Sequence, residues 1–171
     1  MKIEENKIKE YSGTSFSVTK TNGVSKIDFG DKKYIENTNH YGKVFLGDCD
    51  PCTKIKALYN DFTFDKILIA GLGLGLLPEY AKSVKNCSII DVVENNQELI
   101  DYVDYLESPI NIIKGDALSY TPDKKYDLIL IDLWWEEEDV TQEIQDNIKN
   151  NYNSYLETNG KIILPLLEKQ L

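Results

Sequence analysis

Hydrophobic and polar positions follow two different patterns along the chain, and the change occurs near residue 50. Before that point, short segments alternate between apolar and polar residues, which is the pattern of half-buried strands. Four segments are expected to form strands: 16–20, 24–29, 33–37 and 43–46. Between the first two lies Thr21-Asn22-Gly23, a sequence typical of a hairpin turn. We therefore predict an antiparallel ribbon or small sheet over residues 12–48, which must pack against the rest of the chain because it is too small to bury a core.

After residue 50, apolar strands alternate with helical patterns. The expected strands are 66–70, 88–93, 111–113, 126–131 and 161–164, and the expected helices are 52–60, 76–84, 95–106 and 137–156. Strands that are apolar at almost every position are typical of a parallel sheet covered on both faces. The sequence therefore predicts an α/β fold with a Rossmann-like, mostly parallel sheet that ends after its fifth strand. We expect an N-terminal hairpin extension over 1–50 and the α/β domain over 51–171.

Composition and charge narrow the classes of partner. The chain has 171 residues, 42% of them hydrophobic, and a formal net charge of -10. An acidic surface repels phosphate backbones, and the lysines form no basic patch, so we expect no nucleic-acid partner. No apolar run reaches the length of a membrane helix, and the N-terminus is polar, so we expect a cytoplasmic protein that does not bind membranes. The acidity suits a cationic substrate such as a polyamine, but an ordinary solvated surface is the better explanation of it.

The three cysteines give little support for metal or redox chemistry. Cys49 and Cys52 form a CxxC pair, and Cys87 and the single histidine, His40, could in principle complete a metal site. This spacing matches no usual zinc pattern, and an odd number of cysteines without a secretory segment is typical of a reducing compartment. We expect no metal site.

A glycine-rich turn connects the strand at 66–70 to the helix at 76–84. Glycine lets a backbone approach a ligand closely because it has no Cβ. Two carboxylates accompany the turn: Glu94 ends the second parallel strand and Asp116 follows the third. A carboxylate at that strand end accepts hydrogen bonds from ribose hydroxyls in nucleotide-binding folds. We predict a nucleoside site made by Gly71, Leu72, Gly73, Gly75, Glu94, Asn95, Asp116 and Ala117.

Each of these carboxylates also has a purely structural interpretation. Glu94 is an acid placed before a helix, which the helix dipole favours, and Asp116 is a candidate helix cap. The residues after Gly75 are Leu76, Leu77 and Pro78, so the third glycine of a dinucleotide turn is missing. A nucleoside without phosphates, such as S-adenosylmethionine, therefore fits better than NAD, and an NAD-dependent oxidoreductase is disfavoured.

Asp132 ends the strand at 126–131 and is the candidate catalytic residue. A carboxylate there faces the ligand crevice and can orient or deprotonate a nucleophile, most plausibly an amine, although a helix-capping role remains open. Trp134 and Trp135 follow, where an aromatic ring can stack on adenine, cover a cation, or act as a lid or dimer contact. We interpret the acidic residues 136–139 first as a solvated helix start.

Five segments, in order, resemble the spermidine synthase-like branch of the class I S-adenosylmethionine-dependent methyltransferase superfamily. They are 41–48, 66–75, 93–94, 115–117 and 126–132, within a match over roughly 16–164. The resemblance implies S-adenosylmethionine or a related adenosyl-sulfonium compound as cofactor, including the decarboxylated form or methylthioadenosine. It also implies that Glu94 holds the ribose, that Asp116 lies beside the adenine and that Asp132 activates an amine. Tyr34, Tyr41, Trp134 and Trp135 are the candidates on the substrate side.

The departures from this family concern the reacting end of the cofactor. Leu74 stands where aminopropyltransferases carry an aspartate, Ile35 replaces a glutamine, and Trp135 replaces a second aspartate. Ile69 stands where methyltransferases usually have an acid. We therefore expect either a transferase that moves a methyl or aminopropyl group to a small acceptor, or a non-catalytic nucleoside-binding or assembly protein. The sheet edge left open after the fifth strand predicts self-association into a homo-oligomer.

Overall fold

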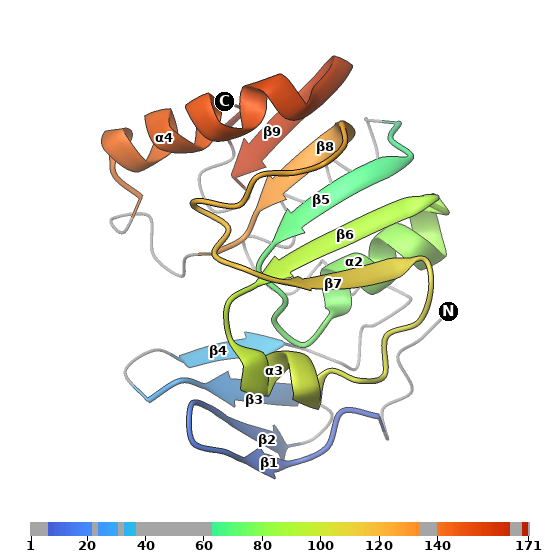
Figure 1. Cartoon of the computed structure of the whole chain (residues 1–171). Coiled ribbons are helices and arrows are strands. Elements are labelled where there is room, and N and C mark those ends of the chain that lie inside the picture. Colours follow the sequence, from blue (N-terminus) through green and yellow to red (C-terminus); the bar gives the residue numbers. More distant parts are fainter. Residues whose placement is uncertain are drawn as a thin grey trace.

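The computed structural model describes residues 7–21, 24–30, 33–36, 63–133, 140–164 and 169–170. In these residues the chain forms a small antiparallel sheet and a larger, mostly parallel sheet with helices (Figure 1). The expected strand at 43–46 and the expected helix at 52–60 lie outside the described residues.

The small sheet is an antiparallel meander in which each strand pairs with the next along the chain. Its strands are β1 (Tyr11–Ser12), β2 (Ser17–Thr21), β3 (Val24–Asp28) and β4 (Lys33–Glu36). Thr21 pairs with Val24, so the β2–β3 hairpin is closed by the two residues between them, as the sequence predicts. The prediction of an N-terminal antiparallel sheet is confirmed for these strands.

The larger sheet has the strand order β10-β9-β8-β5-β6-β7. Its strands are β5 (Lys66–Ala70), β6 (Ile89–Glu94), β7 (Ile110–Lys114), β8 (Tyr126–Ile131), β9 (Leu156–Leu164) and β10 (Lys169–Gln170). The pairs among β5 to β9 are all parallel, which confirms the predicted α/β fold. The parallel part ends at its fifth strand, β9, as predicted, and the two-residue strand β10 adds an antiparallel pair to the end of β9.

Strand β9 is also longer than expected at its start. It begins at Leu156, and Gly160 lies inside it rather than before it. The pairing with β8 shifts register between Tyr126 and Leu128. A Cβ on Gly160 would lie 2.9 Å from the carbonyl oxygen of Tyr126, so glycine is needed where the irregular pairing brings the two backbones together.

Alternate residues of a strand point to opposite faces of the sheet, and in the central strands β5 and β8 residues on both faces are buried. On β5, Ile67 and Ile69 belong to one hydrophobic cluster, and Leu68 and Ala70 belong to another. The first cluster includes side chains of α2 (Leu76–Tyr80), of α3 (Gln97–Tyr102) and of the small sheet. The second includes side chains of α4 (Gln142–Tyr152), which lies beside β9 (Figure 1). The small sheet therefore completes one face of the core, as expected.

Capping residues shorten two predicted helices. The helix expected at 137–156 begins at Gln142, because the Thr141 side chain accepts a hydrogen bond from the backbone N–H of Ile144. The helix expected at 95–106 is α3, which begins after Asn96 in the same way and ends at Tyr102. The helix expected at 76–84 is α2 followed by a π-helical turn, η3 (Ala81–Lys85). After α4 comes a 3-10 turn, η5 (Asn153–Tyr155).

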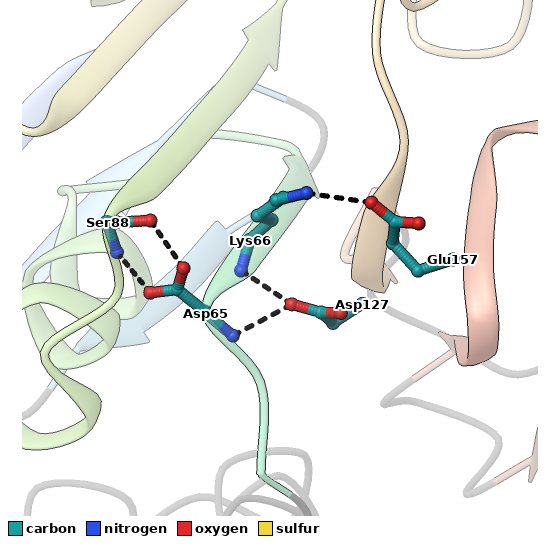
Figure 2. A network of polar contacts seen from close by, with 5 residues as sticks. All are labelled: Asp65, Lys66, Ser88, Asp127 and Glu157. Atoms are coloured by element: carbon teal, nitrogen blue, oxygen red, sulfur yellow. Dashed lines mark hydrogen bonds and ion pairs between the residues drawn. The ribbon is translucent and has the colours of Figure 1, made fainter.

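A polar network ties the strands together at their amino ends (Figure 2). One carboxylate oxygen of Asp127 accepts hydrogen bonds from the backbone N–H groups of Asp65 and Lys66, each at 2.9 Å. The Asp65 carboxylate accepts from the N–H and hydroxyl of Ser88, and Lys66 Nζ lies 2.7 Å from Glu157 Oε1. These contacts hold the sheet at the end opposite to the candidate site.

Candidate functional site

The predicted site residues meet at the carboxyl edge of the parallel sheet. Three backbone hydrogen bonds extend the sheet just beyond the strands: Asp132 N to Ala70 O at 2.9 Å, Gly71 N to Val93 O at 2.9 Å, and Gly115 N to Glu94 O at 3.0 Å. The segments after β8, β5, β6 and β7 therefore lie side by side in that order. This is the edge where parallel α/β sheets bind ligands.

The glycine turn depends on backbone conformations that other residues rarely adopt. Gly71, Gly73 and Gly75 have φ of +99°, +51° and +77°. A Cβ on Gly71 would lie 2.3 Å from the carbonyl oxygen of Asp132, so this glycine allows the β5 and β8 segments to approach. The N–H of Gly75 donates to the carbonyl of Leu72 at 2.9 Å and closes the turn before α2.

The apolar residues of the turn belong to the core. Leu72 is 4% exposed and Leu74 is 0% exposed, and both lie in the cluster that contains Ile69. The Tyr105 hydroxyl donates to the carbonyl of Leu74 at 2.9 Å and fixes the turn from α3's side. These side chains are thus used in packing, and they do not offer polar groups to a ligand.

Glu94 is oriented by the backbone on both sides of it. One carboxylate oxygen accepts from the N–H of Leu72 at 3.1 Å, and the other accepts from the N–H of Asn96 at 2.7 Å. Each carboxylate oxygen has two acceptor positions, so capacity remains for two further donors. Asn95 is exposed, and its carbonyl accepts a hydrogen bond from Lys114.

Asp116 and Ala117 form a tight turn after β7. Asp116 is exposed, and its Oδ1 accepts from the N–H of Leu118 at 3.0 Å, which closes a turn. No helix follows Asp116 among the described residues before β8, so the interpretation of Asp116 as a helix cap is wrong. Ala117 is buried, and its carbonyl accepts a hydrogen bond from the Tyr152 hydroxyl of α4. The turn is therefore held against the α4 face of the sheet and stands at the same edge as Glu94.

Asp132 is half-buried at the end of β8. Its side chain makes no hydrogen bond or ion pair to any other residue in the described part of the chain. Burial raises the pKa of this carboxyl to about 6. A carboxyl group that titrates close to neutral pH and carries no structural partner is suited to exchanging protons.

The remaining candidates are placed only in part. Tyr34 lies in β4, at the register position opposite Ile27. Tyr41, Trp134 and Trp135 lie outside the described residues. So do His40, Cys49 and Cys52, while Cys87 is buried and its thiol lies 3.6 Å from the carbonyl oxygen of Phe64.

The described residues contain neither a cluster of metal ligands nor a helix that could span a membrane. Within 7–21, 24–30, 33–36, 63–133, 140–164 and 169–170, no three His, Cys, Asp or Glu side chains gather as a metal would require. No helix in those ranges is both long and apolar enough to cross a membrane.

Three residues beside the site, Ser15, Asn96 and Glu98, are not among the candidates that the sequence predicts. Asn96 caps α3, and its backbone N–H donates to Glu94. The Ser15 hydroxyl accepts a hydrogen bond from the Asn96 side chain and donates one to Glu98. Asn96 carries a local signal, since an asparagine directly before a helical pattern is a common cap. Ser15 carries none, because its partners lie more than eighty residues away in sequence.

Comparison with known proteins gives matches to solved structures alone, since no family model and no curated protein matches the chain. One match is an S-adenosylmethionine-dependent methyltransferase from Clostridium acetobutylicum, with 20% identity, a TM-score of 0.53, and coverage of 74% of this chain and 54% of that one. Another is a putative caffeoyl-CoA O-methyltransferase from Staphylococcus aureus, with 24% identity, a TM-score of 0.51, and coverage of 64% and 54%.

The chain has the fold of the class I S-adenosylmethionine-dependent methyltransferases. A third match with this fold is the glycopeptide N-methyltransferase MtfA in complex with S-adenosylmethionine, at 12% identity and a TM-score of 0.53, covering 67% of this chain and 53% of that one. MtfA has also been solved with S-adenosyl-L-homocysteine. The chain spans about half the length of these methyltransferases.

Proposed function

We propose that the chain binds S-adenosylmethionine, or a related adenosyl-sulfonium compound, at the carboxyl edge of the sheet and transfers a group from it to a small acceptor. The observation that carries this proposal is the geometry of Glu94. Its carboxylate bridges the N–H groups of Leu72 and Asn96 beside the glycine turn and keeps acceptor capacity for two hydroxyl donors. The methyltransferase fold supports it, since neighbours with that fold bind this cofactor.

The residues present suit an adenosyl group. Glu94 would accept hydrogen bonds from the ribose hydroxyls, and the turn from Gly71 to Gly75 would lie along the nucleoside without a Cβ in the way. Asp116 and Ala117 would border the adenine, on the far side of β6 from Asp132.

Asp132 is the group proposed to act on the acceptor. The bound sulfonium supplies an electrophilic carbon, so the protein mainly has to align an acceptor with it. The Asp132 carboxyl, with a pKa of about 6, is largely ionised at neutral pH and would take the proton that an attacking amine loses. An amine acceptor, and the closeness to spermidine synthases, rest on the sequence motifs and the acidic charge of the chain.

A second function is favoured by the buried apolar residues of the site. Leu74 and Ile69 are both 0% exposed, so they cannot contact the polar aminoalkyl tail of the cofactor. A protein that recognises the nucleoside and ignores the tail would be a non-catalytic binding or assembly protein.

Calorimetric titration with S-adenosylmethionine, its decarboxylated form, methylthioadenosine and NAD tests both proposals. We expect binding of the adenosyl compounds, and binding weaker by about ten-fold or more in Glu94→Ala, because hydrogen bonds to a charged group are lost. Asp104→Asn, which changes an exposed acid in the turn after α3, is the matched control. Preference for NAD would overturn the proposed ligand.

The same titration separates the transferase from the binding protein. A gain in affinity from the aminoalkyl tail, with turnover that falls in Asp132→Asn, supports the transferase. Equal affinity for methylthioadenosine and S-adenosylmethionine, without turnover on any amine, supports the binding protein instead.

A further inference from the structure

The Glu98 carboxylate joins α3 to the segment that precedes β2. It accepts hydrogen bonds from Tyr11 Oη at 2.8 Å, Thr14 N at 2.7 Å, Thr14 Oγ1 at 2.7 Å, Ser15 N at 2.9 Å and Ser15 Oγ at 2.7 Å. The bonds from Ser15 and Thr14 lower the pKa of Glu98 to about 2, so the carboxylate is ionised at neutral pH. A Cβ on Gly13 would overlap Oε1 of Glu98, which shows how closely the segment wraps the carboxylate.

Ser15 extends this contact toward the site. Its hydroxyl lies near both Glu98 and Asn96, but it has only one proton to donate. The bond to the charged Glu98 at 2.7 Å takes that proton. The hydroxyl oxygen then accepts from Asn96 Nδ2 at 2.9 Å, which leaves Asn96 Oδ1 to cap α3 through the N–H of Leu99.

Asn96 is the residue that completes the path to Glu94. Its backbone N–H donates to Glu94 Oε1 at 2.7 Å, the shorter of the two hydrogen bonds that orient that carboxylate. Asn96 is therefore held by Ser15 on its side chain and holds Glu94 with its backbone. The path runs from residue 15 to residue 94 through two hydrogen bonds.

An independent contact joins the same segment to the glycine turn. The rings of Tyr11 and Phe16 lie 5.1 Å and 5.6 Å from the ring of Tyr102, and Tyr102 lies 6.4 Å from Tyr105. The Tyr105 hydroxyl donates to the carbonyl of Leu74 inside the turn. Aromatic packing against the small sheet thus supports the glycine turn, which lies beside Glu94 at the candidate site.

We propose that Glu98 and Ser15 are positioning residues that hold the Glu94 carboxylate in its ribose-binding orientation through Asn96. The role of Glu94 toward ribose rests on the proposed function. Figure 1 shows the small sheet beside α3, so docking of this sheet and orientation of the site carboxylate occur together. The N-terminal sheet is then a support for the nucleoside site as well as a cover for the core.

Two variants test this inference, each measured with and without ligand. Ser15→Ala removes the hydroxyl and leaves the Glu98 charge, and Glu98→Gln removes the charge. Asp101→Asn is the matched control, since it removes a charge from the same helix at a residue whose carboxylate accepts from Gln97. Amide hydrogen exchange of Leu72 and Asn96 is followed by NMR without ligand, with Ile90 in the core of β6 as the reference for global opening.

We expect the Leu72 and Asn96 amides to exchange roughly five-fold faster in Ser15→Ala, and faster still in Glu98→Gln, with Ile90 unchanged. Affinity for S-adenosylhomocysteine should fall roughly in parallel, and Asp101→Asn should match the wild type. Unchanged exchange at both amides in both variants would overturn the inference. If the wild type binds no adenosyl compound, the proposed function fails, while the exchange comparison still decides whether Glu98 and Ser15 hold Glu94.

Discussion

At Gly71 the main chain has φ of +99° and passes so close to Asp132 that a methyl group would overlap a carbonyl oxygen. Gly30 has a similar φ of +91°, but a Cβ there would meet nothing within 4 Å. Comparing the two glycines therefore separates the free-energy cost of the backbone conformation from the free-energy cost of a steric clash. The sequence identified Gly71 as a ligand-facing glycine, whereas the structure shows that the neighbouring strand already requires it.

Replacing Gly71 by alanine should destabilise the protein much more than replacing Gly30 by alanine. Gly30→Ala adds only the strain of a left-handed conformation, about 1–2 kcal/mol. Gly71→Ala adds the displacement of the ends of β5 and β8, so its total loss in the free energy of unfolding should be about 3 kcal/mol or more. Urea unfolding of both variants measures the difference. Equal losses in the two variants would show that the backbones at Gly71 separate easily.

The raised pKa of Asp132 predicts how its replacement changes stability with pH. Because the folded-state pKa, about 6, lies above the unfolded value, the folded state prefers the protonated carboxyl. The stability from this preference is present below about pH 4 and is lost as pH rises through about 6. Asp132→Asn should therefore raise the free energy of unfolding at pH 8 by up to about 3 kcal/mol, with little change at pH 4.

Urea unfolding at the two pH values checks this, with Asp104→Asn as a control at an exposed acid. A higher free energy of unfolding of Asp132→Asn at pH 8, together with lost turnover, would show that Asp132 serves function at a cost in stability. An equal effect at both pH values would mean that the pKa of Asp132 is not raised.

At the scale of the elements, the strands were predicted better than the helices. β5 and β8 have the predicted bounds, because each is a short apolar run between polar residues. The predicted start of the helix at residue 137 is wrong, because Thr141 caps the helix, whereas acidic residues such as those before Thr141 also favour a first turn. Capping depends on the conformation of a single residue, which hydrophobic periodicity does not reveal.

A buried network around Asp91 connects three elements and has no periodic signal in the sequence. Asp91 lies in β6 at 2% exposure and accepts from Asn111 Nδ2 at 2.9 Å, Lys124 Nζ at 3.0 Å and Tyr126 Oη at 2.7 Å. Burial raises the pKa of Asp91, but the hydrogen bonds from Asn111, Tyr126 and Lys124 outweigh it and leave the pKa below its usual value. The network therefore keeps a buried carboxylate charged by supplying three donors, one from β7, one from β8 and one from the residues just before β8.

Removal of one donor from this network should destabilise the fold. Tyr126→Phe leaves a buried carboxylate with one hydrogen bond fewer, which costs about 1–3 kcal/mol. Tyr155→Phe, at the half-buried end of η5, should change stability by less than about 0.5 kcal/mol. Thermal unfolding of both variants makes the comparison. A neutral Tyr126→Phe would mean that Asn111 and Lys124 satisfy Asp91 by themselves.

At the scale of the whole molecule, the two sheets share one core. Phe16, Val18 and Ile27 of the small sheet lie in the same cluster as Ile67 and Ile69 of the parallel sheet. The small sheet thus buries its apolar face only by packing on the α/β part, as its size predicted. The same packing brings Ser15 and Glu98 together and ties the small sheet to the candidate site.

The outer edge of β9 supports a prediction about assembly. In the part of the chain that the structure describes, β10 pairs only with Ile163 and Leu164, while β9 begins at Leu156. An unpaired strand edge tends to be covered, so we expect self-association through this edge. Sedimentation velocity over a range of concentrations measures it, and Thr158→Lys, a charge added at an exposed edge residue, should weaken the association. A monomer at every concentration would contradict it.

The sequence by itself determined the succession of the strands β5 to β9 and of the helices between them, the glycine turn and the carboxylates at the strand ends. These features are local, since an apolar run, a glycine or an acid can be interpreted from the few residues around it. Only the tertiary structure decided that Leu72 and Leu74 are buried, and that Asn96 donates to Glu94. It also decided that Ser15 forms hydrogen bonds with Asn96 and Glu98. The contacts of Ser15 with Asn96 and Glu98 join residues more than eighty positions apart, and they exist only once the small sheet has packed against the parallel sheet.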